Sequence, residues 1–342
     1  MVFKYLKKLF FYNRRKRSYL GENLTIAAKS YQKAAEQGHA ISQYHLGLLY
    51  QDGKGIPQDV ATAISWYQKA AEQGHAISQY HLGLLYQDGK GVPQDLTTAI
   101  SWYQKAAEQG HAISQYHLGL LYQDGKGVPQ DLTTAISWYQ KAAEQGHAIS
   151  QYHLGLLYQD GKGVPQDLTT AISWYQKAAE QRHITSQYHL GLLYQDGKGV
   201  PQDMATAISW YQKAAEQGHA ISQYHLGLLY QDGKGIPQDV ATAISWYQKA
   251  AEQGHAISQY HLGLLYQDGK GVPQDLTTAI SWYQKAAEQR HITAQYHLGL
   301  LYQDGKGVRQ DKFQAKEWFG KACDSGDQNG CDKYRILNES GY

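Results

Sequence analysis

Sixteen histidines are the side chains best suited to proton transfer or metal binding in this sequence of 342 residues. They recur twice in every 36 residues, and one member of each pair forms a column with a single imidazole per repeat. Packed helices lie about 8–10 Å apart, whereas zinc needs its ligands about 2 Å from one ion. We therefore expect no metal site in this column, which comprises His45, His81, His117, His153, His189, His225, His261 and His297.

Two functions remain open for the histidine column. The rings could be structural, bonded to other side chains of the array, or they could donate hydrogen bonds to the backbone of a bound peptide. Imidazole titrates near neutral pH. A ligand-binding column therefore predicts an affinity that changes between about pH 5 and pH 7.

The acids and bases of the chain recur almost unchanged from one repeat to the next, as Asp52, Lys54, Asp59, Lys69 and Glu72 illustrate. An active site needs different groups that converge at one place and whose environments shift their pKa values apart. No G-x-S-x-G, Walker or H-E-x-x-H motif occurs in the sequence. We expect a non-enzymatic protein that has no cofactor.

These residues lie on a 36-residue repeat that occurs eight times between residues 39 and 326. In the first copy, periodic apolar residues predict one helix from Ala40 to about Gln51 and a second from Asp59 to about Gln73. The intervening DGKGIPQD contains the glycines and the proline of a turn, and Asp59 is a suitable N-cap. Neither helix can bury its apolar face within one hairpin, so neighbouring repeats must stack to form the core.

Three segments lie outside the eight copies. Residues 23–38 match the second half of the repeat and predict a half-repeat that covers the first full one, and residues 327–342 predict a C-terminal cap or tail. Residues 1–22 form a distinct segment, in which positions 1–17 hold seven bases and no acid. This segment could be a solvated tail, an amphipathic helix on an anionic membrane surface or a targeting signal.

The charge balance argues against nucleic acid as a partner of the array. The net charge is +2, but the chain without residues 1–17 carries 25 bases against 30 acids. A mildly acidic surface does not attract a phosphate backbone. No apolar run approaches the roughly 18 residues that span a bilayer, and no clear secretory signal is present. We expect a cytoplasmic protein, membrane-associated if residues 1–17 bind lipid, with secretion or delivery to a host cell left open.

The repeat resembles the Sel1-like repeat, a relative of the tetratricopeptide repeat, over about 85% of the chain. In the copy at 75–110 the matching residues are Leu82, Gly83, Tyr86, Gly89, Gly91, Val92, Pro93, Asp95, Ala99, Trp102, Tyr103, Lys105, Ala106, Ala107 and Gly110. The resemblance implies an all-α fold, a right-handed superhelix of αα-hairpins whose first helices line a concave face. It also implies a role as an adaptor or scaffold for other proteins.

By similarity to tetratricopeptide repeats, the groove is lined by Ile41, Tyr44, His45, Leu48, Gln51 and the residues 36 positions further along. The candidate ligand-binding residues are Tyr44, His45, Leu48, Gln51, Tyr80, His81, Leu84, Gln87, Tyr116, His117, Leu120, Gln123, Tyr152, His153, Leu156 and Gln159. Nearly identical repeats offer nearly identical contacts. We therefore expect a protein or peptide partner that is extended or repetitive and binds through several repeats at once.

Departures from the family pattern include the serine at Ser42 and most of its successors, the histidine at His45 and its successors, and two arginines. Arg182 and Arg290 replace the glycine that ends the other repeats, which costs about 1 kcal/mol each if the backbone there is left-handed. Cys323 and Cys331 resemble a pair in cysteine-rich Sel1-type bacterial proteins, which implies a disulfide in an oxidising compartment and two thiols otherwise. Some of those proteins are described as β-lactam-binding hydrolases. Hydrolysis of β-lactams is therefore one alternative function, and tethering to a membrane surface through residues 1–17 is another.

Overall fold

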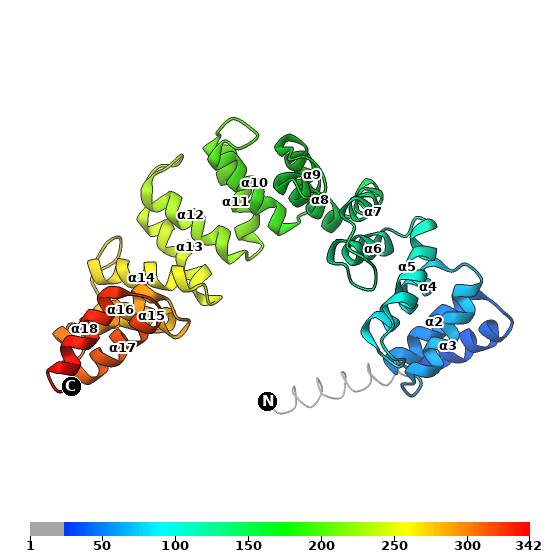
Figure 1. Ribbon diagram of the computed structural model, residues 1–342, viewed down its shortest axis with the longest axis horizontal. Coiled ribbons are helices and arrows are strands. Elements are labelled where there is room, and N and C mark those ends of the chain that lie inside the picture. Colours follow the sequence, from blue (N-terminus) through cyan, green and yellow to red (C-terminus); the bar gives the residue numbers. More distant parts are fainter. Residues whose placement is uncertain (1–23) are drawn as a thin grey trace, which may run out of the picture. The chain divides into compact units, whose positions relative to one another are not determined.

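The computed structural model describes residues 24–342, and all the regular secondary structure in this range is helical. The helices pair into consecutive hairpins, in each of which a first helix, here called helix A, packs beside a second, helix B (Figure 1). The chain divides into two compact units, Met1–Ala178 and Ala179–Tyr342, and both are built from the same hairpin. The predicted all-α array of helical hairpins is confirmed.

The helices follow the 36-residue period without interruption. The A helices are α2 (Ala40–Asp52), α4 (Ala76–Asp88), α6 (Ala112–Asp124), α8 (Ala148–Asp160), α10 (Ile184–Asp196), α12 (Ala220–Asp232), α14 (Ala256–Asp268), α16 (Ile292–Asp304) and α18 (Gln328–Glu339). The B helices are α3 (Val60–Glu72), α5 (Leu96–Glu108), α7 (Leu132–Glu144), α9 (Leu168–Glu180), α11 (Met204–Glu216), α13 (Val240–Glu252), α15 (Leu276–Glu288) and α17 (Lys312–Asp324). Residues 24–36 form one more helix of the B type.

Polar side chains at the helix starts set these boundaries. Asp59 caps α3, since its carboxylate accepts from the backbone N–H of Thr62 at 3.0 Å, so the helix itself begins one residue later than predicted. His39 caps α2 in the same way, because its Nδ1 accepts from the backbone N–H of Ser42 at 3.3 Å. The histidine cap was not predicted, because histidine is not among the preferred N-cap residues.

The buried core is shared between neighbouring hairpins. Ala63 and Tyr67 of α3 are 0% exposed. Leu82 of the following helix α4 belongs to the same cluster, and Trp102 of α5 packs against it. Burial of each large apolar side chain contributes roughly 1.5–3 kcal/mol. A hairpin therefore obtains much of its core from the next repeat, as the pattern of apolar residues predicts.

Glycine on each A helix lets the two helices of a hairpin approach closely. A Cβ atom at Gly83 would lie 2.5 Å from the ring of Tyr103. The hydroxyl of that tyrosine donates to Oε1 of Gln87 at 3.0 Å. The absence of a side chain on one helix thus leaves a space, and a fully buried aromatic ring of the other helix fills it.

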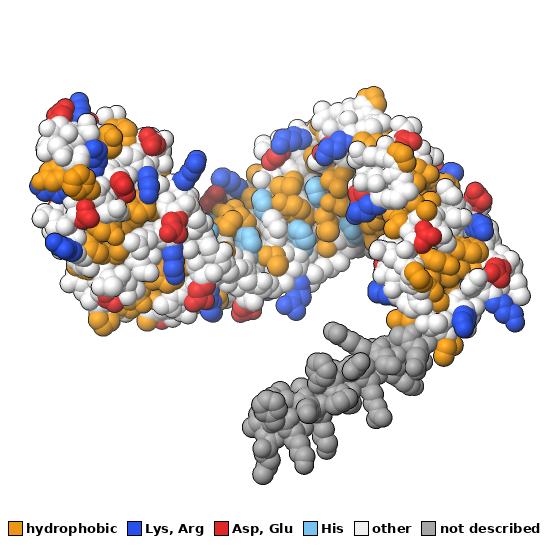
Figure 2. All heavy atoms as spheres, turned by 90° about the horizontal axis from the view of Figure 1, so that it is seen from below, with side chains coloured by type: hydrophobic (Ala, Val, Ile, Leu, Met, Phe, Trp, Pro, Cys, Tyr) orange, Lys and Arg blue, Asp and Glu red, His pale blue; other side chains and the backbone are white. Residues whose placement is uncertain are grey.

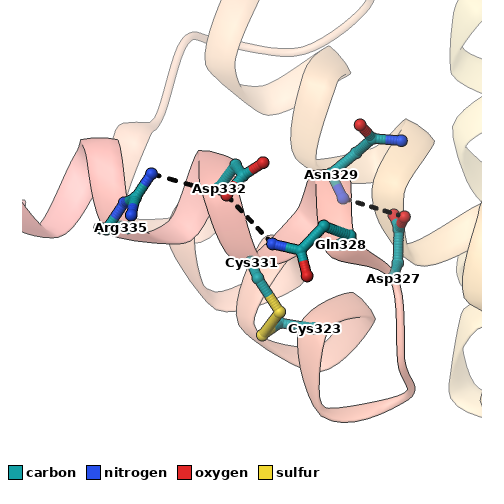
Figure 3. The surroundings of a disulfide bond; sticks show 7 residues. All are labelled: Cys323, Asp327, Gln328, Asn329, Cys331, Asp332 and Arg335. Atoms are coloured by element: carbon teal, nitrogen blue, oxygen red, sulfur yellow. Dashed lines mark hydrogen bonds and ion pairs between the residues drawn. A yellow bond between two sulfur atoms is a disulfide. The ribbon is translucent and has the colours of Figure 1, made fainter.

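Helix α18 lies at the C-terminal end of the array. A disulfide between Cys323 and Cys331 joins α17 to α18 (Figure 3). Arg335 stands where every preceding A helix has its glycine. The glycine that admits a B-helix ring in the other hairpins is therefore replaced by a long side chain in α18.

The predicted segment 1–22, with the candidate membrane-binding residues 1–17, lies outside the described residues. Within residues 24–342, no helix is long and apolar enough to cross a membrane. The first described helix resembles the other B helices, but its Tyr31 is half-buried, whereas the equivalent Tyr67 is completely buried.

Candidate functional site

The residues predicted to line a groove all lie on the A helices, and all except the column of Ile41 are half-buried. Tyr44, His45, Leu48 and Gln51 of α2 share this intermediate exposure with their successors in the following repeats. Ile41, predicted beside them, is 52% exposed. Figure 2 shows histidine side chains lying among hydrophobic side chains on one face of the molecule.

Within each unit, the tyrosines and histidines of this face contact one another from repeat to repeat. The ring of Tyr80 lies 5.1 Å from His111 and 5.6 Å from His117, both of the next repeat. His117 in turn stacks on the buried Tyr103 at 5.1 Å. The two histidines of a repeat therefore contact the same tyrosine, one from the helix cap and one from the helix itself. These contacts within the array favour the structural interpretation of the histidine column.

Burial favours the neutral form of His81 and His117. It lowers the pKa of His81, and the charge of the neighbouring His111 lowers it further. For His117, burial and the charge of His147 lower the pKa to about 4. At neutral pH these two rings are therefore uncharged, and their nitrogens can serve as hydrogen-bond partners. The hydroxyl of Tyr44, for example, lies 3.4 Å from Nε2 of His81.

Open pockets repeat along this face within the unit Ala179–Tyr342. The first has a volume of about 860 Å³, and three predicted columns contribute to its lining, through Gln195, His225 and Leu228. The next has about 780 Å³, and the equivalent Gln231, His261 and Leu264 line it. The tyrosine column is absent from both linings. Successive repeats thus offer the same pocket again.

Charged residues of the turns complete the pockets. Asp232 and Lys234 line both of them and form an ion pair of 2.8 Å, so this pair stands between neighbouring pockets. The equivalents of Asp52 and Lys54 were not predicted to line the groove, because a turn position accounts for the aspartate. Their recurrence in every repeat was the signal that could have revealed them. Such exposed ion pairs contribute little to stability, so their charges remain available to a ligand.

Metal ligands do not converge on this face. Among residues 24–342, no group of three or more His, Cys, Asp or Glu side chains could hold a metal ion. The carboxylates that are held most firmly serve as helix caps; hydrogen bonds from Thr62, for instance, lower the pKa of Asp59.

Comparison with known proteins identifies the repeat. The family model described as the Sel1 repeat matches nine consecutive segments, at 19–39, 40–75, 76–111, 112–147, 148–183, 184–219, 220–255, 256–291 and 292–327. The chain belongs to the Sel1 repeat family. Sel1 repeat proteins are generally scaffolds for protein interaction and are generally not catalytic.

Two solved structures share the arrangement over most of the chain. One is a protective antigen of uropathogenic Escherichia coli strains with an SLR fold, 36% identical, with a TM-score of 0.86 over 92% of this chain and 68% of that one. The other is a Sel1 repeat protein from Oxalobacter formigenes, 36% identical, with a TM-score of 0.74 over 90% of this chain and 89% of that one. No curated protein matches the sequence significantly.

Proposed function

We propose that this Sel1 repeat protein is a non-enzymatic scaffold that binds an extended polypeptide in the groove formed by its A helices. The observation that carries the proposal is the recurrence of one pocket in successive repeats, with the same imidazole, leucine and glutamine positions in each. A ligand that occupies several such pockets must itself be extended.

The pocket lining suits a polypeptide. Each residue of an extended chain carries one backbone donor and one backbone acceptor. Asp232 can accept from a backbone N–H, Lys234 can donate to a carbonyl, and Gln231 can do both. Leu264 gives an apolar surface for a side chain beside these groups. The mixture of polar groups and one half-buried leucine therefore matches backbone recognition with modest side-chain selectivity.

The repetition also determines where the affinity originates. Individual exposed contacts of this kind are weak, and linked contacts raise the overall affinity by making the later ones intramolecular. The removal of one repeat should therefore weaken binding gradually. A single pocket that carries all the affinity would be inconsistent with a groove of equivalent sites.

The direct test selects binders from a phage library of unstructured 16-residue peptides with the full chain as bait. Affinities of the selected peptides are then measured by fluorescence anisotropy for a groove variant, Leu120→Gln with Leu156→Gln. A matched variant changes two exposed B-helix residues, Ser137→Gln with Ser173→Gln. Each leucine should lose about half of a side-chain burial, about 1 kcal/mol, so the groove variant should bind tenfold more weakly or worse.

The control decides between groove binding and general loss of structure. Thermal unfolding of both variants shows whether the array stays folded, and the serine variant should bind as the wild type does. Equal affinity of the groove variant and the serine variant would refute the groove. Saturable turnover of nitrocefin by the full chain would contradict the non-enzymatic part of the proposal and would support the β-lactam alternative.

A further inference from the structure

Identical repeats leave a bound polypeptide without a preferred register. The copies at 39–74 and 219–254 are the same residue for residue, as are those at 147–182 and 255–290. Between residues 39 and 308, the only changes of charge among the copies are Arg182 and Arg290, which stand where the other repeats end in glycine. Both arginines belong to the unit Ala179–Tyr342.

Both arginines are held in a backbone conformation that favours glycine. Their φ angles are +66° and +62°, and no other non-glycine residue in the described part of the chain has a positive φ. The turn is otherwise unchanged, since the N–H of Arg290 donates to the carbonyl of Ala287 at 2.9 Å and that of Gly254 donates to Ala251 at 3.0 Å. Strain of this kind persists where the surrounding structure imposes it and often marks a functional position.

The two guanidinium groups are available to a ligand. Both residues are exposed, and within residues 24–342 neither forms an ion pair. Each is followed directly by the histidine that caps the next A helix. His291, next to Arg290, stacks on the groove residue Tyr260 at 4.8 Å. The arginines therefore border the face of tyrosine and histidine rings, at the N-terminal ends of α10 and α16.

Exposed isoleucines lie between the two arginines along the chain. In the two intervening repeats, Ile221 and Ile257 are 41% and 42% exposed. In the two repeats that directly follow an arginine, the equivalent position holds a threonine, Thr185 or Thr293, and Ile292 beside Thr293 is 41% exposed. The edge of the groove thus carries an arginine before His183 and His291 and a glycine before His219 and His255, and each of these four turns has a glutamate two residues before that position.

We propose that Arg182 and Arg290 bind two carboxylates of the polypeptide partner and so fix its register on the array. This inference rests on the proposed function and adds the chemistry of the partner. The arginines are three repeats apart, which corresponds to roughly 24–30 Å if neighbouring A helices lie about 8–10 Å apart. An extended chain rises about 3.3 Å per residue. The partner segment therefore has two acidic residues about seven to nine positions apart, with apolar residues between them.

Synthetic 12-residue peptides test this inference on the full chain. The first has glutamate at positions 2 and 10 with valine and threonine between them, and the second has glutamine in place of both glutamates. Because an exposed charge pair typically changes affinity up to about fivefold, the wild type should prefer the glutamate peptide by roughly tenfold at 50 mM salt. The preference should shrink at 200 mM salt, where screening is stronger. A third peptide, with its second glutamate moved to position 6, should show only about half of the preference over the glutamine peptide.

Matched variants separate the arginines from general charge. Arg182→Gly with Arg290→Gly should abolish the preference, whereas Arg182→Lys with Arg290→Lys should retain much of it. Lys213→Gln with Lys249→Gln removes the same charge from exposed positions of the B helices and should change little. If the wild type binds both peptides equally, or if the glycine variant keeps the preference, the register proposal is wrong although the groove stands. If the wild type binds none of the peptides, the groove proposal fails as well.

Discussion

Replacement of Arg290 by glycine should stabilise the protein, because the arginine occupies a left-handed backbone conformation with φ +62°. An L-residue in this region costs about 1–2 kcal/mol relative to glycine. Glycine in turn gives back about 0.4–1 kcal/mol, since it increases the entropy of the unfolded chain. The net expectation for Arg290→Gly is a gain of about 0.5–1 kcal/mol, and no ion pair is lost within the described residues.

The reciprocal change provides the control. Gly254 has φ +89°, and a Cβ atom there would meet nothing within 4 Å. Gly254→Arg therefore tests backbone conformation alone and should destabilise by about the amount that Arg290→Gly gains. Urea unfolding followed by circular dichroism measures both, with comparison of midpoints at equal slope.

Two results would refute this reasoning. If Arg290→Gly lowers the midpoint, the arginine side chain makes a stabilising contact that outweighs its backbone strain. If Gly254→Arg is neutral, the left-handed position carries no conformational penalty. Additivity offers a further check, since Arg182 lies three repeats away and the double variant should gain about twice as much.

Three more predictions follow from the packing and the titrating groups. Burial holds the pKa of His117 at about 4 in the folded protein, whereas it is about 6.5 in the unfolded chain. The neutral ring therefore contributes fully to the free energy of unfolding above pH 6.5, and about 3 kcal/mol of this contribution is lost as the pH falls towards 4. The urea midpoint should drop over that range. Gly119→Ala would place a Cβ atom 2.5 Å from the ring of the buried Tyr139 and should destabilise by roughly 1–3 kcal/mol in thermal unfolding. Cys323→Ser with Cys331→Ser opens a short loop, with a sequence separation of 8, and should cost about 2–3 kcal/mol, detected as faster hydrogen exchange in α18 while distant repeats stay protected.

The fold could be predicted almost completely because the same pattern of helix, turn and cap residues occurs eight times in the sequence. The period, the turn glycines and the Asp59 cap each follow from local chemistry, and Gly83 and Tyr103 show why their spacing holds two helices together. The histidine caps could not be predicted in the same way. They depend on the ring of His39 turning back to its own helix, which spacing alone does not reveal.

The candidate site was harder to predict than the fold. His225, Leu228 and Gln195 of the predicted columns line one pocket, and Asp232 and Lys234 line it as well, although a turn position alone accounts for the aspartate. A residue can end a helix and still face a ligand. A contribution to a pocket depends on the neighbouring repeat, which the periodicity of one repeat does not show.

The two arginines are expected to lower the stability of the protein and to strengthen the binding of an acidic partner. If they only reflect duplication of a block of sequence, their replacement by glycine should raise the urea midpoint and leave peptide preference unchanged. If they fix the register of a partner, the same replacement should raise the midpoint and remove the preference for the acidic peptide. Because the variant is expected to be more stable than the wild type, weaker binding could not be attributed to unfolding. One double variant therefore distinguishes a tolerated strain from a functional one.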